Sequence, residues 1–242
     1  RTLDDCMVGA GSVLVGAALY GKALYNAWKP RKVGIYGTSM VGKTTLDRYM
    51  TTPGEMEEIA DDERTDHFKL ITRYMLPKPT RKRVGWNGEK RVVYSADIGG
   101  QERFWNLWTD DMVARQVEVV VYMFDDRAFK GKEGMEQIAG FKFLVDSLIN
   151  KNYRYRTLKS RWKGKKYSPR LIMLVANKAD RFFDQKAAEL WQQGRIGEHK
   201  IFDPFRDELI RLQKAGMPTK RAFMATRVGW NVEPTMIDLL TT

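Results

Sequence analysis

A glycine-rich loop, GTSMVGKT, runs from Gly37 to Thr44 and directly follows the short apolar run VGIY. It fits G-x-x-x-x-G-K-[ST], a pattern whose backbone N–H groups turn inward to bind phosphates. Lys43 would reach the β- and γ-phosphates, and the Thr44 hydroxyl would bind Mg²⁺. The segment therefore predicts a nucleoside triphosphate site. The loop residues expected to contact it are Gly37, Ser39, Met40, Val41, Gly42, Lys43, Thr44 and Thr45.

A second motif, NKAD, comprises residues 177–180 and follows the apolar run LIMLVA. The Asp180 carboxylate can accept two hydrogen bonds from guanine, one from the ring N–H and one from the exocyclic amine. Adenine lacks this pair of donors and would leave the carboxylate unsatisfied, so the site would discriminate against it. Asn177 would brace the loop, and Lys178 would lay its aliphatic stem on the ring. The motif predicts guanine as the base.

A third motif, DIGGQERFWNLW, covers residues 97–108 between the other two. In this order the three motifs resemble those of the Ras-like small GTPases, over about residues 32–242. The Arf-like branch is the nearest, because DIGGQERFWNLW is similar to its D-V-G-G-Q followed by L-W. The stretch YMFDDRA also resembles a strand of that branch that ends in an acid, and ATRVGWNV (225–232) resembles the family's base-contacting stretch.

The resemblance implies a role for each matching residue. Asp97 would hold Mg²⁺ through water, and Gly100 would donate its N–H to the γ-phosphate. Gln101 would orient the attacking water, which makes Gln101 and Lys43 the expected catalytic residues. Loss of the γ-phosphate would release the segment. The residues expected against guanine are Ala225, Thr226 and Arg227, and the apolar surface hidden or presented by the movement would be Phe104, Trp105, Leu107 and Trp108.

The first switch of this family needs a threonine that reaches both Mg²⁺ and the γ-phosphate. Thr65, in DERTDHF, has the best placement. Its neighbour Arg64 would be either a solvated loop residue or an arginine supplied in cis for hydrolysis. Ser39 stands where Ras has a hydrolysis-sensitive glycine, although the family tolerates other residues there.

Strand-like and helix-like segments alternate along the chain after residue 32. This rhythm predicts an α/β fold, the three-layer α/β/α P-loop NTPase domain, with ligands at the carboxyl ends of a mostly parallel six-stranded sheet. The second and third strands should pair as a hairpin. Strands are expected at 33–36, 67–76, 91–97, 117–124, 171–176 and 221–225, and helices at 43–50, 133–150, within 184–214 and from about 233.

Residues 6–21 form an uncharged segment rich in glycine and alanine. It is shorter than the ~20 residues that usually span a bilayer, although a tilted helix whose Lys22 side chain extends to the membrane surface could still span it. Trp28, Lys29 and Arg31 supply an interfacial aromatic and a positive flank. We expect residues 1–31 to form a hydrophobic helix in contact with a membrane and 32–242 to form the GTPase domain. The alternative is a buried or partner-bound helix.

The chain carries a formal net charge of +12, which points to an anionic partner. Residues 151–166 contain eight Lys or Arg and no acid, with three aromatic residues among them. Such a stretch suits anionic lipid or nucleic acid, with lipid favoured by the N-terminal segment, or it serves only solubility. A lone Cys6 excludes an intramolecular disulfide and suits a reducing compartment.

Together these features predict a GTP-binding switch that hydrolyses GTP to GDP with Mg²⁺, slowly without an activating partner. It would lie at the cytosolic face of a membrane and recruit effector proteins in the GTP state, under GAP- and GEF-type regulators. Two alternatives share the same motifs. One is a membrane-tethered scaffold that holds guanine nucleotide without cycling, and the other is a nucleic-acid-associated GTPase that uses residues 151–166.

Overall fold

The computed structural model describes residues 31–51, 72–75, 92–95, 98–150 and 167–241. Within them, six strands form one sheet in the order β2-β3-β1-β4-β5-β6. β2 and β3 pair antiparallel, whereas every other neighbouring pair is parallel. The predicted mostly parallel sheet with one hairpin pair is therefore confirmed. The strands are β1 (Arg31–Tyr36), β2 (Thr72–Met75), β3 (Val92–Ser95), β4 (Val119–Phe124), β5 (Leu171–Ala176) and β6 (Thr219–Phe223).

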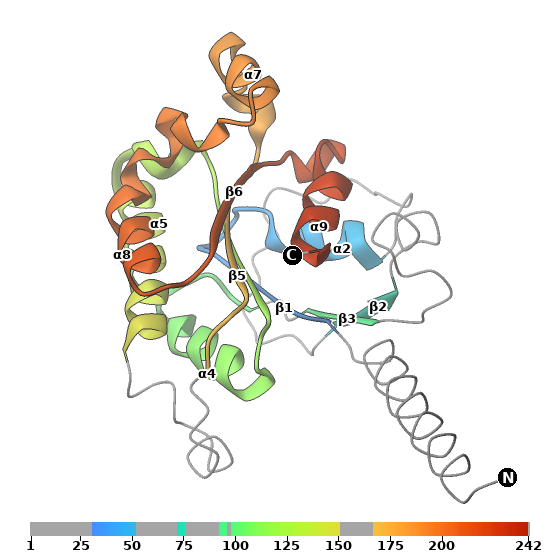
Figure 1. Ribbon diagram of the computed structural model, residues 1–242, viewed down its shortest axis with the longest axis vertical. Helices are drawn as coiled ribbons and strands as arrows, with labels where there is room; N and C mark the ends of the chain where they lie inside the picture. The colour runs from blue at the N-terminus through green and yellow to red at the C-terminus, as the bar shows by residue number, and fades with distance from the viewer. Residues whose placement is uncertain (1–30, 52–71, 76–91, 96–97, 151–166, 242) are drawn as a thin grey trace, which may run out of the picture.

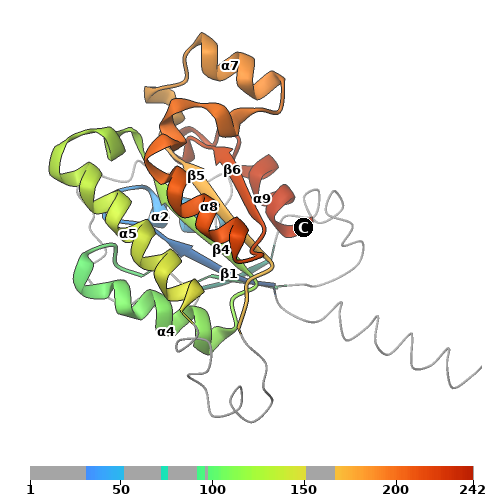
Figure 2. The ribbon, with the colours of Figure 1, turned by 60° about the vertical axis from the view of Figure 1, so that its left-hand side comes forward.

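Five helices of the described residues cover the two faces of the sheet, and a sixth, α7, lies beyond the end of the sheet near β6 (Figures 1 and 2). α4, α5 and α8 pack on one face, and α2 and α9 pack on the other, which gives the predicted three layers. The helices are α2 (Lys43–Thr51), α4 (Trp105–Arg115), α5 (Gly131–Ile149), α7 (Gln185–Gln192), α8 (Arg206–Lys214) and α9 (Val232–Thr241).

The central strands β4 and β5 are buried along their whole length because both of their faces are covered. Successive side chains alternate between the two layers. Tyr122 and Phe124 join the core beneath α4, α5 and α8, whereas Val121 and Met123 join the core beneath α2 and α9. This explains why residues 119–124 read as a continuous apolar run.

Short 3₁₀ segments replace part of the helix expected within residues 184–214. α7 is followed by η5 (Ile196–Glu198) and η6 (Lys200–Phe205) before α8 begins. Pro204 lies inside η6, where it cannot donate a backbone hydrogen bond. Asp184 caps α7 by accepting the backbone N–H of Ala187 at 2.8 Å.

Every motif found in the sequence follows a strand at the same edge of the sheet. The glycine-rich loop follows β1, residues 98–101 come shortly after β3, and NKAD follows β5. Residues 225–227 follow β6 in the same way.

None of the helices in the described ranges is long and apolar enough to cross a membrane. The predicted N-terminal helix at 1–31 and the basic stretch 151–166 lie outside those ranges, apart from Arg31 in β1.

Candidate nucleotide site

The glycine-rich loop has a backbone that only certain residues can adopt. Gly37 has φ +145°, and a Cβ placed there would lie 2.3 Å from the carbonyl oxygen of Met123. Gly42 has φ +94°, and its Cβ would lie 2.3 Å from Nδ2 of Asn177. Met40 also has a positive φ of 62°. The two glycines of the motif are thus required because the loop lies against β4 and against NKAD.

Side chains from several elements hold the carbonyl groups of this loop. Lys43 is only 6% exposed, and its ammonium donates to the carbonyl oxygens of Gly37 at 2.9 Å and Thr38 at 2.8 Å. Nδ2 of Asn177 donates to Val41 O at 2.8 Å. These bonds fix the loop in one shape and place a positive charge at the start of α2, where an anion would also meet the helix dipole.

The NKAD motif is joined to the loop after β6. Asn177 is fully buried, and its Oδ1 accepts the backbone N–H of Thr226 at 3.0 Å while Nδ2 lies 3.0 Å from Thr226 Oγ1. The N–H of Ala179 donates to Met224 O at 3.0 Å. Asp180 and Arg227 are exposed, so both can reach a ligand from these two braced loops.

Gly99 and Gly100 lie against the glycine-rich loop and are held there by two tryptophans. A Cβ on Gly100 would lie 2.1 Å from the carbonyl carbon of Thr38, so only glycine fits. The indole N–H of Trp105 donates to Gly100 O at 3.1 Å, and that of Trp108 donates to Gly99 O at 3.2 Å. Both tryptophans belong to the core. In this arrangement these two residues of the predicted apolar surface are therefore hidden in the core. That movement of the segment presents them stays a prediction.

A buried polar network fixes α4 to β1, the strand that leads into the loop. The Tyr36 hydroxyl donates to Oδ2 of Asp111 at 2.6 Å, and Arg115 binds the same carboxylate through Nε at 2.5 Å. Arg115 Nη1 also donates to Val33 O at 3.1 Å. Burial, together with the adjacent carboxylate, raises the pKa of Tyr36 well above its usual value, so the hydroxyl stays protonated and keeps donating.

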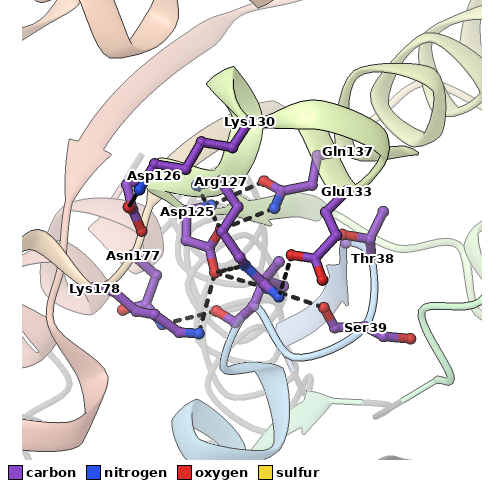
Figure 3. Close-up of polar contacts among 12 residues, drawn as sticks. Thr38, Ser39, Asp125, Asp126, Arg127, Lys130, Glu133, Gln137, Asn177 and Lys178 are labelled. Carbon is purple, nitrogen blue, oxygen red and sulfur yellow. Dashed lines mark hydrogen bonds and ion pairs between the residues drawn. The ribbon is translucent and has the colours of Figure 1, made fainter. Parts of the chain in front are cut away.

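A second polar cluster at the end of β4 was not predicted (Figure 3). The carboxylate of Asp125 is fully buried and accepts Arg127 Nε at 2.9 Å, Gln137 Nε2 at 2.8 Å and, in an ion pair, Lys178 Nζ at 3.1 Å. Burial alone would raise the pKa of Asp125, but the hydrogen bonds from Arg127 and Gln137 outweigh it and leave the pKa below its usual value. Asp125 therefore remains a carboxylate and links β4 to NKAD.

Arg127 extends this cluster to the glycine-rich loop. Its Nη2 donates to Ser39 O at 3.3 Å, and its Nη1 lies 3.1 Å from Oε2 of Glu133 on α5. Arg127 and Glu133 border a cavity of about 230 Å³. The other residues lining this cavity are Thr38, Ser39, Met40, Gln101, Glu136 and Gln137.

The structure brings several of the predicted site residues into contact with one another. The glycine-rich loop contacts NKAD and Thr226 on one side and Gly100 on the other, and Gln101 lines the cavity beside Ser39. Asp97 and Thr65, predicted to bind Mg²⁺, and Arg64 lie outside the described residues. In the described part of the chain, His, Cys, Asp and Glu form no cluster of three that could hold a metal ion.

The sequence matches no model in a scan of protein families, and a search of curated proteins found no match. Solved structures do share the fold. One is the Arl6 (BBS3) small GTPase of Trypanosoma brucei with the bound nucleotide analogue GppNp, at TM-score 0.52 and 14% identity, covering 87% of this chain and 96% of that one.

Another is the bacterial selenocysteine-specific elongation factor EF-Sec, at TM-score 0.50 and 15% identity. That match covers 88% of this chain but only 29% of the elongation factor. The described residues therefore have the P-loop GTPase fold, and they are similar to an Arf-like small GTPase over nearly its whole length.

Proposed function

We propose that this protein is a switch that binds GTP and hydrolyses it to GDP. The observation that carries the proposal is the convergence of three motifs at one edge of the sheet. Lys43 offers a buried ammonium for phosphates, Asp180 offers an exposed carboxylate for a base, and Gln101 lies in a cavity against Ser39. A fold alone does not assign a function, so the support comes from these side chains.

In the proposed reaction the chain's own groups hold GTP and orient the attacking water, and they form no covalent bond with either. The loop and Lys43 bind the phosphates, while Gln101 orients the attacking water. Thr44 has the hydroxyl that would help to hold Mg²⁺, with Asp97 and Thr65 as further proposed ligands. That ion would neutralise phosphate charge when bound.

Replacing Gln101 with Leu tests the proposed hydrolysis. We expect single-turnover GTP hydrolysis to slow by at least about ten-fold, because the water loses the group that orients it. GTP affinity should stay unchanged, since Gln101 would act on the water rather than hold the nucleotide. Gln213→Leu on the exposed face of α8 is the matched control. Equal turnover in both variants would remove Gln101 from the reaction and favour a scaffold that does not cycle.

We further propose that residues 1–31 and the basic stretch 151–166 place the domain at the cytosolic face of a membrane, where the GTP form recruits effectors and meets GAP- and GEF-type regulators. Flotation of the full chain with phosphatidylserine vesicles tests this. Binding should fall when residues 1–28 are deleted, which leaves β1 intact, and when salt is raised. Retention on RNA in place of vesicles would favour the nucleic-acid alternative instead.

A further inference from the structure

Arg127 lies in the cavity that also contains Gln101, the residue proposed to orient water. Its guanidinium reaches this position from the end of β4, and its side chain is 19% exposed. Figure 3 shows it between Asp125 and the glycine-rich loop, with its terminal nitrogens directed toward Ser39 and Glu133. A cation is thus present beside the proposed phosphate loop without help from a second protein.

The two ends of this guanidinium are held very differently. Asp125 is fully buried and accepts both Nε, at 2.9 Å, and Nη2, at 2.8 Å. Glu133 holds the other end, Nη1, from a side chain that is 65% exposed. An ion pair with so exposed a partner contributes only about 0–1 kcal/mol, whereas the buried end is costly to disturb. Nη1 is therefore the end that an anion in the cavity can take over from Glu133.

The charges of the cluster agree with this exchange. Arg127 and Lys178 face Asp125 and Glu133, so the group is balanced as long as Glu133 stays in contact. When Glu133 turns toward solvent, Nη1 of Arg127 loses its anionic partner, while Glu136 still lines the same cavity. An oxyanion of a phosphoryl group would then satisfy Nη1 by a charge-assisted hydrogen bond.

We propose that Arg127 is a catalytic arginine supplied by the chain itself, which binds an oxygen of the γ-phosphoryl group during hydrolysis. The inference rests on the proposed function. In the step, the water oxygen bonds to the γ-phosphorus as the bond to the β,γ-bridging oxygen breaks. The electron pair of that bond stays with GDP, and the proton lost by water ends on the released phosphate. Arg127 binds the negative charge spread over the equatorial oxygens.

The role requires arginine rather than any cation. The planar guanidinium of arginine can keep Nε and Nη2 on Asp125 while Nη1 binds a second oxyanion. A lysine ammonium is a point charge on a flexible stem and cannot make both contacts in this way. Arg127→Lys keeps the buried charge of Asp125 compensated, so it is the first variant to make.

The experiment measures single-turnover GTP hydrolysis by the full chain, GDP affinity, and the affinity of the GDP form for fluoroaluminate, which mimics the transferring phosphoryl group. We expect Arg127→Lys to slow hydrolysis about 20- to 30-fold. That is the ratio between intrinsic rates of about 10⁻² s⁻¹ with an arginine in cis and 3–5 × 10⁻⁴ s⁻¹ without one. Fluoroaluminate binding should weaken by a similar factor, while GDP affinity stays the same. Arg211→Lys is the matched control, because Arg211 also contacts two carboxylates but on α8.

Glu133→Gln should change fluoroaluminate affinity in the opposite direction, because it removes the carboxylate that competes for Nη1 of Arg127. Fluoroaluminate should bind up to about five-fold more tightly to this variant. The proposal would be overturned if Arg127→Lys hydrolysed GTP at the wild-type rate. It would also be overturned if GDP affinity fell as much as the hydrolysis rate, because that result indicates a purely structural arginine. A wild-type chain that does not bind GTP would instead overturn the proposed function, and this inference with it.

Discussion

Replacing Lys43 with Met should weaken GTP binding by about 10² to 10³-fold. The ammonium is buried at the start of α2, and its bonds to Gly37 O and Thr38 O hold it where the loop would bind phosphates. From there it would bind the β- and γ-phosphates by one charge-assisted hydrogen bond each. Such bonds contribute about 1.5–3 kcal/mol each, so losing both phosphate contacts removes roughly 3–4 kcal/mol of binding free energy even after partial compensation. Met keeps the length and the apolar stem of the side chain, so the loss isolates the charge.

Thermal or denaturant unfolding with and without nucleotide measures this effect. At a GTP concentration of 100 Kd, wild type should gain about 2.7 kcal/mol, whereas the variant should gain about 0.4 kcal/mol or less. Lys142→Met, an exposed position on α5, is the control and should keep the full gain. A Lys43→Met protein that is stabilised by GTP as strongly as wild type would show that the loop does not bind phosphates through this lysine.

Replacing Asp180 with Asn should change the preferred base rather than abolish binding. Guanine would present two donors to the Asp180 carboxylate, and the amide of Asn can accept only one of them. We expect GTP affinity to fall by about 10² to 10³-fold. XTP should bind better than GTP, because xanthine carries an oxygen where guanine has its amino group, and the Asn amide N–H can donate to it.

Competition among GTP, XTP and ATP distinguishes this variant from Lys43→Met, which should weaken all three alike. Asp207→Asn on the exposed side of α8 is the control and should leave the order of affinities unchanged. An Asp180→Asn protein that still prefers GTP would mean that Asp180 does not contact the base, and the assignment of guanine would then lose its main support.

Much of the fold could be predicted because local patterns determine it. The alternation of apolar runs and turns located all six strands, although β4 begins at Val119 and β6 at Thr219 rather than at the expected 117 and 221. The glycine-rich loop and NKAD were also predictable, because their residues follow apolar strands at fixed spacing. The two motifs meet because parallel strands end at the same edge of the sheet.

The Asp125 cluster could not be predicted in the same way. Gln137 lies on α5, and Lys178 follows β5, so their contacts with Asp125 arise only from packing. One signal was available: the run YMFDDRA places two acids and an arginine directly after a buried strand. That position indicates a site, but it does not show that Arg127 turns toward Ser39 while Asp125 turns toward Lys178.

The tryptophans that hold Gly99 and Gly100 give the protein a built-in optical probe. Trp105 and Trp108 donate their indole N–H groups to the backbone of this segment, and their rings lie 5.7 Å apart, centroid to centroid. If the segment moves away, both indoles lose a hydrogen-bond acceptor and their surroundings change. The intrinsic emission of an unlabelled sample should therefore report the position of residues 99–100 in real time, against a background from five other tryptophans among the seven of the chain.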